Sequence, residues 1–273
     1  MKTNQTHYFA IAISLIFSAN HFTSRAADAG SRDKDSLIPV SNESGNKYGF
    51  QTQKNEIVIL PIYDAVSNFS EGRAAVEING FWGFIDTSGK KVTPIKYQVV
   101  YDFNEGRACV SRDDKKFGCI DKSGKEVIPL KYDYVIDFSD GLAVANIGDK
   151  FGFIDINGKE IIPLKYDYAE NFSEGVAAVE LNTKNGYIDK AGNVAIPFNY
   201  DASYSFHDGL GLVVVNGRYG FIDHNGNEVI PFKYEWAHNF QNGRAKVGLN
   251  GRTYWIDKND NEVEYSENET NEE

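Results

Sequence analysis

The sequence is short of the residues that build helices and of those that commonly hold metals. Its 273 residues include one methionine, two cysteines and five histidines, and alanine and leucine do not dominate the apolar positions. Glycine (25), phenylalanine (18) and tyrosine (16) are abundant instead, together with valine and isoleucine. These residues favour strands and tight turns. We therefore expect an all-β protein with little helix.

Positive charge is also scarce, and it is scattered along the chain. There are 28 lysine and arginine residues against 39 acidic residues, which gives a formal net charge of −11. Proteins that bind nucleic acid hold the phosphates with a basic stripe, and none is visible here. We expect no nucleic-acid partner.

The N-terminus has the features of a cleaved secretory signal. Lys2 precedes an apolar run over residues 8–19, which is too short to span a bilayer comfortably. Small residues follow, so cleavage could occur after Ala26 or after Ala29. No cysteine lies nearby, which argues against a lipid anchor. We predict a signal peptide over residues 1–26 and an exported protein, periplasmic or secreted, without a membrane span after cleavage.

Two further segments lack the apolar pattern of a folded domain. Residues 27–46 are rich in serine, asparagine and aspartate, and they predict a flexible linker. Residues 266–273 are acidic and contain no apolar side chain, so they predict a disordered tail. The folded domain is expected over residues 47–265.

Within that domain an aspartate that ends a strand returns at a fixed interval. It stands at Asp86, Asp121, Asp155, Asp189, Asp223 and Asp257. The successive spacings are 35, 34, 34, 34 and 34 residues. A fixed period of this length indicates a tandem repeat, and we expect about six antiparallel β units of 34 residues.

Each unit begins with two strands, as residues 151–166 illustrate. Aromatic residues alternate with glycine and isoleucine before the aspartate, which is the two-residue period of a strand. The aspartate and a following glycine predict a turn. The next strand, which contains Ile161-Ile162 in this unit, is expected to be buried on both faces. It carries a proline, which indicates an edge, a bulge or a strand end.

The rest of the unit is marked by a tyrosine and a phenylalanine. Lysine and an acid flank the tyrosine, as at Lys131 and Asp133, and we expect these charges to pair at the surface. The phenylalanine recurs in every unit, which predicts a spine of core residues. Its positions are Phe69, Phe103, Phe138, Phe172, Phe206 and Phe240.

In three places an Asn-Gly dipeptide joins the last strand of one unit to the first strand of the next. Because such turns close two-residue hairpins, counting outward from them predicts the pairs Ala75–Phe84, Leu212–Phe221 and Lys246–Trp255. A fourth hairpin has a one-residue insertion, Asp113-Asp114-Lys115, and counting outward from it still places Cys109 opposite Cys119. Directly opposed residues lie within reach of a disulfide, and we predict one; two reduced thiols are the alternative.

The combined pattern resembles the bacterial WG-repeat family, also called KWG repeats. The resemblance rests on the aromatic-Gly pairs such as Trp82-Gly83, the Ile-Asp-x-x-Gly turn, the Pro-x-x-Tyr-Asp step and the Phe-Ser-x-Gly turn. It extends from about residue 48 to residue 265. Only one unit has tryptophan before the glycine, and Asn185 and Thr253 depart from the aromatic pattern. The resemblance implies a β-rich repeat array without an assigned activity.

No catalytic constellation is visible. His207, His224 and His238 occupy three different repeat positions, so nothing places them around one metal. The recurring aspartates could form a carboxylate row, but the turn already requires them. Residues 257–261 resemble a calcium loop, although Glu262 replaces the required glycine. We expect no catalytic residue, no metal and no cofactor.

Two variable positions follow the tyrosine of each unit, whereas the core positions hardly vary. They carry aromatic residues that we call the aromatic row: Tyr101, Tyr134, Tyr168, Tyr204 and Trp236. Such a surface could bind sugar rings or a partner protein. Irregular packing between units is the alternative interpretation.

Two closures of the array compete. Propeller blades usually need more than 34 residues, and Glu264 and Ser266 place polar groups where other units have isoleucine and leucine, as a capping repeat does. We favour an open β-solenoid over a closed propeller.

The predicted function is that of a non-enzymatic, exported scaffold of the cell envelope that binds a protein or a glycan. A carboxylate-based envelope hydrolase is the alternative.

Overall fold

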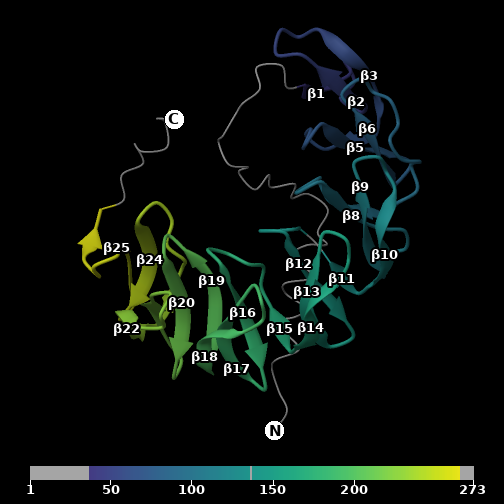
Figure 1. Ribbon diagram of the computed structural model, residues 1–273. Helices are drawn as coiled ribbons and strands as arrows, with labels where there is room; N and C mark the ends of the chain where they lie inside the picture. Colours follow the sequence, from purple (N-terminus) through teal and green to yellow (C-terminus); the bar gives the residue numbers. More distant parts are fainter. Residues whose placement is uncertain (1–36, 136, 265–273) are drawn as a thin grey trace.

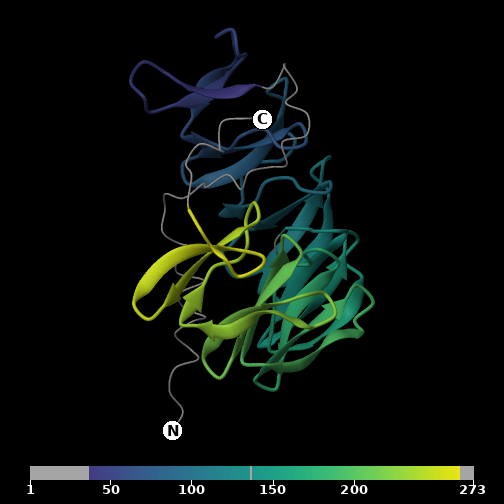
Figure 2. The same cartoon turned by 90° about the vertical axis from the view of Figure 1, so that its left-hand side faces the viewer.

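The computed structural model describes residues 37–135 and 137–264. All regular secondary structure in this part of the chain is β-strand. The strands form seven antiparallel sheets that follow one another along a curved path (Figure 1). Figure 2 shows the first sheets stacked above the later ones. None of the described residues belongs to a helix that could cross a membrane.

The strands are grouped by sheet. The first sheet contains β1 (Ile38–Ser41), β2 (Tyr48–Gln51) and β3 (Ile57–Tyr63), and the second contains β4 (Ala65–Val66), β5 (Arg73–Ile78) and β6 (Phe81–Asp86). The third contains β7 (Val99–Val100), β8 (Arg107–Ser111), β9 (Phe117–Asp121) and β10 (Glu126–Tyr132). The fourth contains β11 (Tyr134–Val135), β12 (Leu142–Ile147), β13 (Lys150–Asp155) and β14 (Glu160–Tyr166).

The last three sheets have the same strand order as the third and fourth. The fifth contains β15 (Tyr168–Ala169), β16 (Val176–Leu181), β17 (Lys184–Asp189) and β18 (Val194–Tyr200). The sixth contains β19 (Ala202–His207), β20 (Leu210–Val215), β21 (Arg218–Ile222) and β22 (Glu228–Tyr234). The seventh contains β23 (Trp236–Ala237), β24 (Arg244–Leu249), β25 (Arg252–Asp257) and β26 (Glu262–Val263).

Each sequence repeat is divided between two sheets. The unit of residues 151–183 supplies β13 and β14 to the fourth sheet and β15 and β16 to the fifth. A hairpin then leads into β17, the first strand of the next unit. The predicted hairpin pairs are confirmed, since Ala75 lies opposite Phe84, Leu212 opposite Phe221 and Lys246 opposite Trp255.

The recurring aspartate is a turn residue in all six units. In one unit Asp155 Oδ1 accepts hydrogen bonds from Asn157 N (2.8 Å) and Lys159 N (2.9 Å). The same pair of bonds is present in the other five. The carboxylates are therefore engaged by their own turns, and they do not form a catalytic or metal-binding row.

The proline-containing strand is the outer edge of its sheet. Ile128 and Ile162 on this strand are fully buried. Val194 and Val229, on the same strand of later sheets, are 56% and 41% exposed. The expectation that this strand is buried on both faces is therefore wrong. Because β10, β14, β18 and β22 have a pairing partner on one side only, proline can replace an N–H there without breaking the ladder.

The phenylalanine spine fills the space between successive sheets. Phe172 lies just before β16, and its ring centroid is 4.8 Å from that of Phe153 on β13 of the preceding sheet. Phe221 and Phe240 make the same contact at 4.8 Å. Five of the six residues are almost fully buried, and Phe69 is partly buried against the first two sheets. The predicted core spine is confirmed.

The acid after each tyrosine joins two sheets. Asp167 follows β14, and its carboxylate accepts hydrogen bonds from Lys150 Nζ on β13 (2.5 Å) and from Asn182 N in the hairpin of the next sheet (2.7 Å). We call this arrangement the aspartate clamp. It recurs at Asp64, Asp133 and Asp201.

The clamp corrects the predicted surface pairing of Lys131 with Asp133. Asp133 instead binds Lys116 (2.5 Å), whereas Lys131 Nζ lies 5.0 Å from the centre of the Tyr132 ring. Residues two apart share a face only within one strand. Here the strand ends at the tyrosine, and the chain turns towards the next sheet.

The N-terminal boundary of the folded domain also needs correction. The predicted linker of residues 27–46 contains β1, which pairs with β2 over Ile38–Ser41. The turn between them is closed by Asn42 Oδ1, which accepts from Asn46 N (3.1 Å) and Lys47 N (3.2 Å). The predicted signal peptide (1–26) and acidic tail (266–273) lie outside the described residues.

Truncation of one spine residue tests how much the packing between sheets contributes. We expect Phe172→Ala to lower the free energy of unfolding by about 3–5 kcal/mol, because it leaves a cavity between two sheets. Phe81→Ala is the matched control, since Phe81 is 43% exposed in a hairpin and should cost below about 0.5 kcal/mol. Urea denaturation followed by tryptophan fluorescence measures both. Equal losses in the two variants would contradict the spine.

The aspartate clamps predict a loss of stability in acid. Hydrogen bonds from the lysines lower the pKa of Asp133, Asp167 and Asp201 below the ordinary value of 3.8, and backbone N–H groups lower it further. Each group therefore stabilises the fold fully above its unfolded pKa and loses this contribution as pH falls through its folded pKa. Denaturation midpoints measured from pH 6 to pH 2 should show the loss below about pH 4. Asp167→Asn should make that loss smaller, and an unchanged acid profile would argue against the clamp.

Candidate binding site

The aromatic row begins at the first strand of each four-stranded sheet. This strand is the edge opposite the proline-containing strand. In Figure 1, β10, β18 and β22 lie on the outside of the curved path. The aromatic row follows the opposite edges of consecutive sheets, which the first strands form.

The residues of the aromatic row differ in exposure. Tyr168 is 41% exposed and packs against Phe151 of the preceding sheet, with ring centroids 5.7 Å apart. Tyr101 is half-buried and lies 6.3 Å from Phe117. Trp236 packs on Gly248, its partner in the ladder. The contact requires glycine, because a Cβ atom added at Gly248 would lie 2.1 Å from the indole Nε1 of Trp236. Each ring thus rests on the scaffold by one part and keeps another part accessible.

The tyrosines stand close enough to influence one another. Burial raises the pKa of Tyr101, and the neighbouring Tyr134 raises it further. Burial also raises the pKa of Tyr168, and the nearby Glu170, Tyr134 and Tyr204 raise it further. The phenols therefore remain protonated at neutral pH and can donate hydrogen bonds.

Glu170 connects this row to the next repeat. Its Oε2 accepts hydrogen bonds from Ser205 N (2.7 Å) and Ser205 Oγ (2.6 Å). Burial raises the pKa of Glu170, whereas the bonds from Ser205 and the nearby His207 oppose that rise. Ser205 lies within β19, which has six residues. The first strands of the other four-stranded sheets have two.

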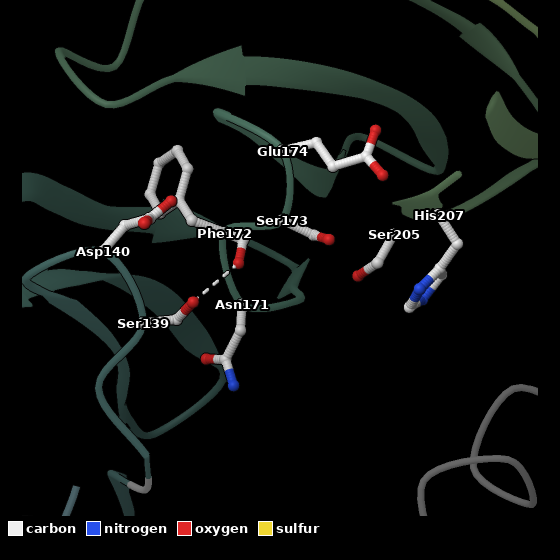
Figure 3. Close-up of a pocket in the computed structure, with 8 residues that line it drawn as sticks. All are labelled: Ser139, Asp140, Asn171, Phe172, Ser173, Glu174, Ser205 and His207. Atoms are coloured by element: carbon white, nitrogen blue, oxygen red, sulfur yellow. Dashed lines mark hydrogen bonds between the residues drawn. The ribbon is translucent and has the colours of Figure 1, made fainter. Parts of the chain in front are cut away.

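A pocket of about 260 Å³ opens beside Ser205. It is lined by groups from three successive repeats (Figure 3): Ser139, Asp140, Asn171, Phe172, Ser173, Glu174, Ser205 and His207. Two of the hydroxyls support the scaffold, since Ser139 Oγ donates to Phe172 O (3.0 Å) and Ser173 Oγ donates to Phe206 O (2.7 Å). Figure 3 places Glu174, Ser205 and His207 together on one side of the pocket.

The two carboxylates of the pocket are already engaged by neighbouring groups. Asp140 Oδ2 lies 3.1 Å from Lys190 Nζ. Glu174 accepts a hydrogen bond from Gly209 N (3.0 Å) and lies 3.5 Å from His224 Nε2. The pocket therefore offers hydroxyl, amide and imidazole groups beside carboxylates that already have partners, which suits a neutral polar ligand better than a cation.

The structure brings some of the predicted binding residues together and separates others. Tyr134 and Tyr204 stand on the sheets before and after Tyr168 and close to it, whereas Trp236 packs with His238 at 5.5 Å on the last sheet. The sequence analysis missed Asn171 and Ser205, and it dismissed His207. His207 could have been found from its repeat position. It directly follows the spine phenylalanine, where other units have a serine hydroxyl: Ser70, Ser139 and Ser173.

The calcium-like segment is used internally. Asp257 Oδ1 accepts from Asn259 N (2.8 Å) and Asn261 N (2.9 Å), and Asp260 contacts Lys233 and Tyr234 of the preceding sheet. Asp260 occupies the turn position where the other units have glycine, with a φ of 66°. Within the described ranges no group of histidine, cysteine, aspartate or glutamate could hold a metal ion.

The two cysteines lie directly opposite each other on β8 and β9, as the hairpin count predicts. Their Cα atoms are 4.0 Å apart and the sulfur atoms are joined. Both side chains are buried next to Ile128 and Tyr132. Oxidation of this pair in the cell stays a prediction.

Comparison with protein families identifies the repeat. The family model described as "WG containing repeat" matches six consecutive segments: residues 48–80, 82–115, 117–151, 151–184, 186–219 and 219–252. These boundaries agree with the division of each unit between two sheets. A search of curated proteins finds no match to this sequence.

Solved structures resemble this chain at low identity. A structure described as a eukaryotic initiation factor is 12% identical, over 86% of this chain and 73% of that chain, with a TM-score of 0.54. BamB from Moraxella catarrhalis is 13% identical over 82% of both chains, with a TM-score of 0.42. The similarity to the initiation factor concerns the fold alone.

The cysteine pair predicts a protein without free thiols. We expect no reaction with a thiol reagent under denaturing, non-reducing conditions when the chain is recovered from an oxidising compartment. Replacing both Cys109 and Cys119 with alanine should lower the free energy of unfolding by about 2–3 kcal/mol in the loop-entropy model. Two titratable thiols per freshly exported chain would contradict the bridge.

Proposed function

We propose that this chain, which belongs to the family of WG containing repeats, is an exported, non-enzymatic binding scaffold of the cell envelope. Its partner is a glycan that lies along the aromatic row and reaches the pocket beside Ser205. A protein partner on the same row is the second candidate, because half-exposed tyrosines are also common at protein interfaces.

The observation that carries the proposal is the position of the tyrosines relative to the pocket. Tyr168 presents 41% of its surface, and Glu170, two residues further, binds the Ser205 that lines the pocket. Aromatic faces and mixed hydrogen-bonding groups are thereby adjacent. A sugar offers apolar C–H faces and hydroxyl groups, so it matches both kinds of surface.

A binding role fits the charged groups better than catalysis does. A glycosidase needs two carboxylates in a cleft, one of them held protonated. Asp140 is instead paired with Lys190, and Glu174 accepts a hydrogen bond from Gly209 N. This pairing supports a scaffold over the carboxylate-based hydrolase.

The proposal includes an open array. In Figures 1 and 2 the first and last sheets lie apart, and no strand of one pairs with the other within the described residues. The last sheet also has a polar end, because β26 has two residues and Arg252 binds Glu262 (2.8 Å). Such an end suits a capping unit, and an open array leaves the edges that carry the aromatic row accessible to a long ligand.

Removal of the aromatic row tests the proposed site. We expect the variant with alanine at Tyr134, Tyr168, Tyr204 and Trp236 to lose binding to envelope glycans on an array, with an unchanged far-ultraviolet circular dichroism spectrum. Phe81→Ala removes an exposed aromatic from a hairpin outside the row and should bind normally. Glycan binding that survives in the fourfold variant would contradict the proposal. Loss of a protein from an envelope pull-down, without any glycan signal, would favour the second candidate.

Export has a separate test. The chain expressed in a bacterium with its own N-terminus should lose its first 26 or 29 residues, because a charged start, an apolar run and small residues form a cleavable signal. Intact-mass analysis of the envelope fraction identifies the new N-terminus. Soluble cytoplasmic protein that retains Met1 would argue against export.

A further inference from the structure

The outer strand of the first sheet differs from its counterparts. In β14 the exposed positions hold Glu160, Pro163 and Lys165, whereas the corresponding positions of β3 hold isoleucine, leucine and isoleucine. The correspondence is fixed by the ladder, since Ile59 pairs with Phe50 as Ile162 pairs with Phe153. Glutamate and lysine on an edge strand oppose association, and both are replaced by isoleucine in β3, whose proline stands one position later, at Pro61.

The replaced residues form a compact apolar surface. We call the exposed side chains of β3 the β3 patch: Ile57 (55% exposed), Val58 (46%), Leu60 (67%) and Ile62 (55%). Between them, Ile59 and Tyr63 are buried and fix the strand against the core. The patch is therefore held rigidly in an exposed position.

We propose that the β3 patch is the interface of a homodimer, in which two copies meet through the first sheet about a two-fold axis. Residues 57–63 carry no charge, although the chain has a net charge of −11. Two copies therefore repel each other over most of their surface but not here. The rim holds both signs, because Lys47 and Asp64 form an ion pair (2.5 Å).

The two ends of the array favour a closed dimer over a filament. The corresponding outer strand of the last sheet is β26, where Glu262 is exposed and paired with Arg252. A head-to-tail contact would place the apolar patch against these charges. A two-fold contact instead places the patch against an identical patch, which closes the assembly at two copies.

The size of the patch sets the expected strength of the dimer. Four aliphatic side chains at about half exposure present on the order of 400 Å² per copy. Two such patches approach the lower end of specific interfaces, about 1,000 Å² in total with the rim. The dimer should therefore depend on protein concentration.

Sedimentation velocity on the purified full chain over a concentration series tests the proposal. We expect the mass to change from monomer to dimer as concentration rises. The variant Ile57→Glu, Leu60→Lys, Ile62→Lys places charges on exposed positions of β3, as β14 does with Glu160 and Lys165, and it should dimerise at least tenfold more weakly. Val194→Glu is the matched control, because Val194 is 56% exposed in the same column as Ile57 but on the fifth sheet; its dimer should be unchanged.

Circular dichroism and thermal melting establish that each variant is folded. If the triple variant fails to fold, Leu60→Lys alone replaces it, since Leu60 is 67% exposed. The proposal is overturned by a wild-type chain that is monomeric at every concentration, whether or not the patch then captures another protein or a lipid vesicle. A dimer that persists in the folded β3 variant, or one that Val194→Glu weakens equally, overturns it as well.

Discussion

The structure depends on the division of each repeat between two sheets. Because β13 and β14 belong to one sheet and β15 and β16 to the next, the covalent chain itself ties neighbouring sheets together. The phenylalanine spine fills the space between them, and the aspartate clamps fasten their ends. The positions that recur in every unit serve these contacts. The edges formed by the first strands are free to vary, and the aromatic row lies there.

Short-range chemistry made much of this fold predictable. Asn-Gly turns set the register of three hairpins, and counting outward from the Asp113-Asp114-Lys115 turn likewise predicted the opposition of Cys109 and Cys119. The turn aspartates and the phenylalanine spine were equally accessible, because each acts within a few residues or recurs once per unit. These features depend on local geometry or on the period, and a sequence displays both.

Contacts between repeats were not accessible in the same way. Asp133 binds Lys116, seventeen residues away, and not the nearer Lys131, because the chain leaves the strand plane after Tyr132. The pocket gathers Ser139, Ser173 and His207 from three consecutive units. Only knowledge that equivalent turns lie side by side would assemble it. Strand β1 was missed because a short apolar segment inside a polar stretch lacks the aromatic-Gly signature.

Photo-crosslinking from the aromatic row tests the binding role most directly. A benzoylphenylalanine placed at Tyr168, in the chain expressed in a bacterium that exports it, should crosslink to an envelope glycan or protein on irradiation. The same group at Phe81, which is similarly exposed at 43%, should not. Crosslinks from both positions alike, or from Phe81 only, would contradict a partner bound along the aromatic row.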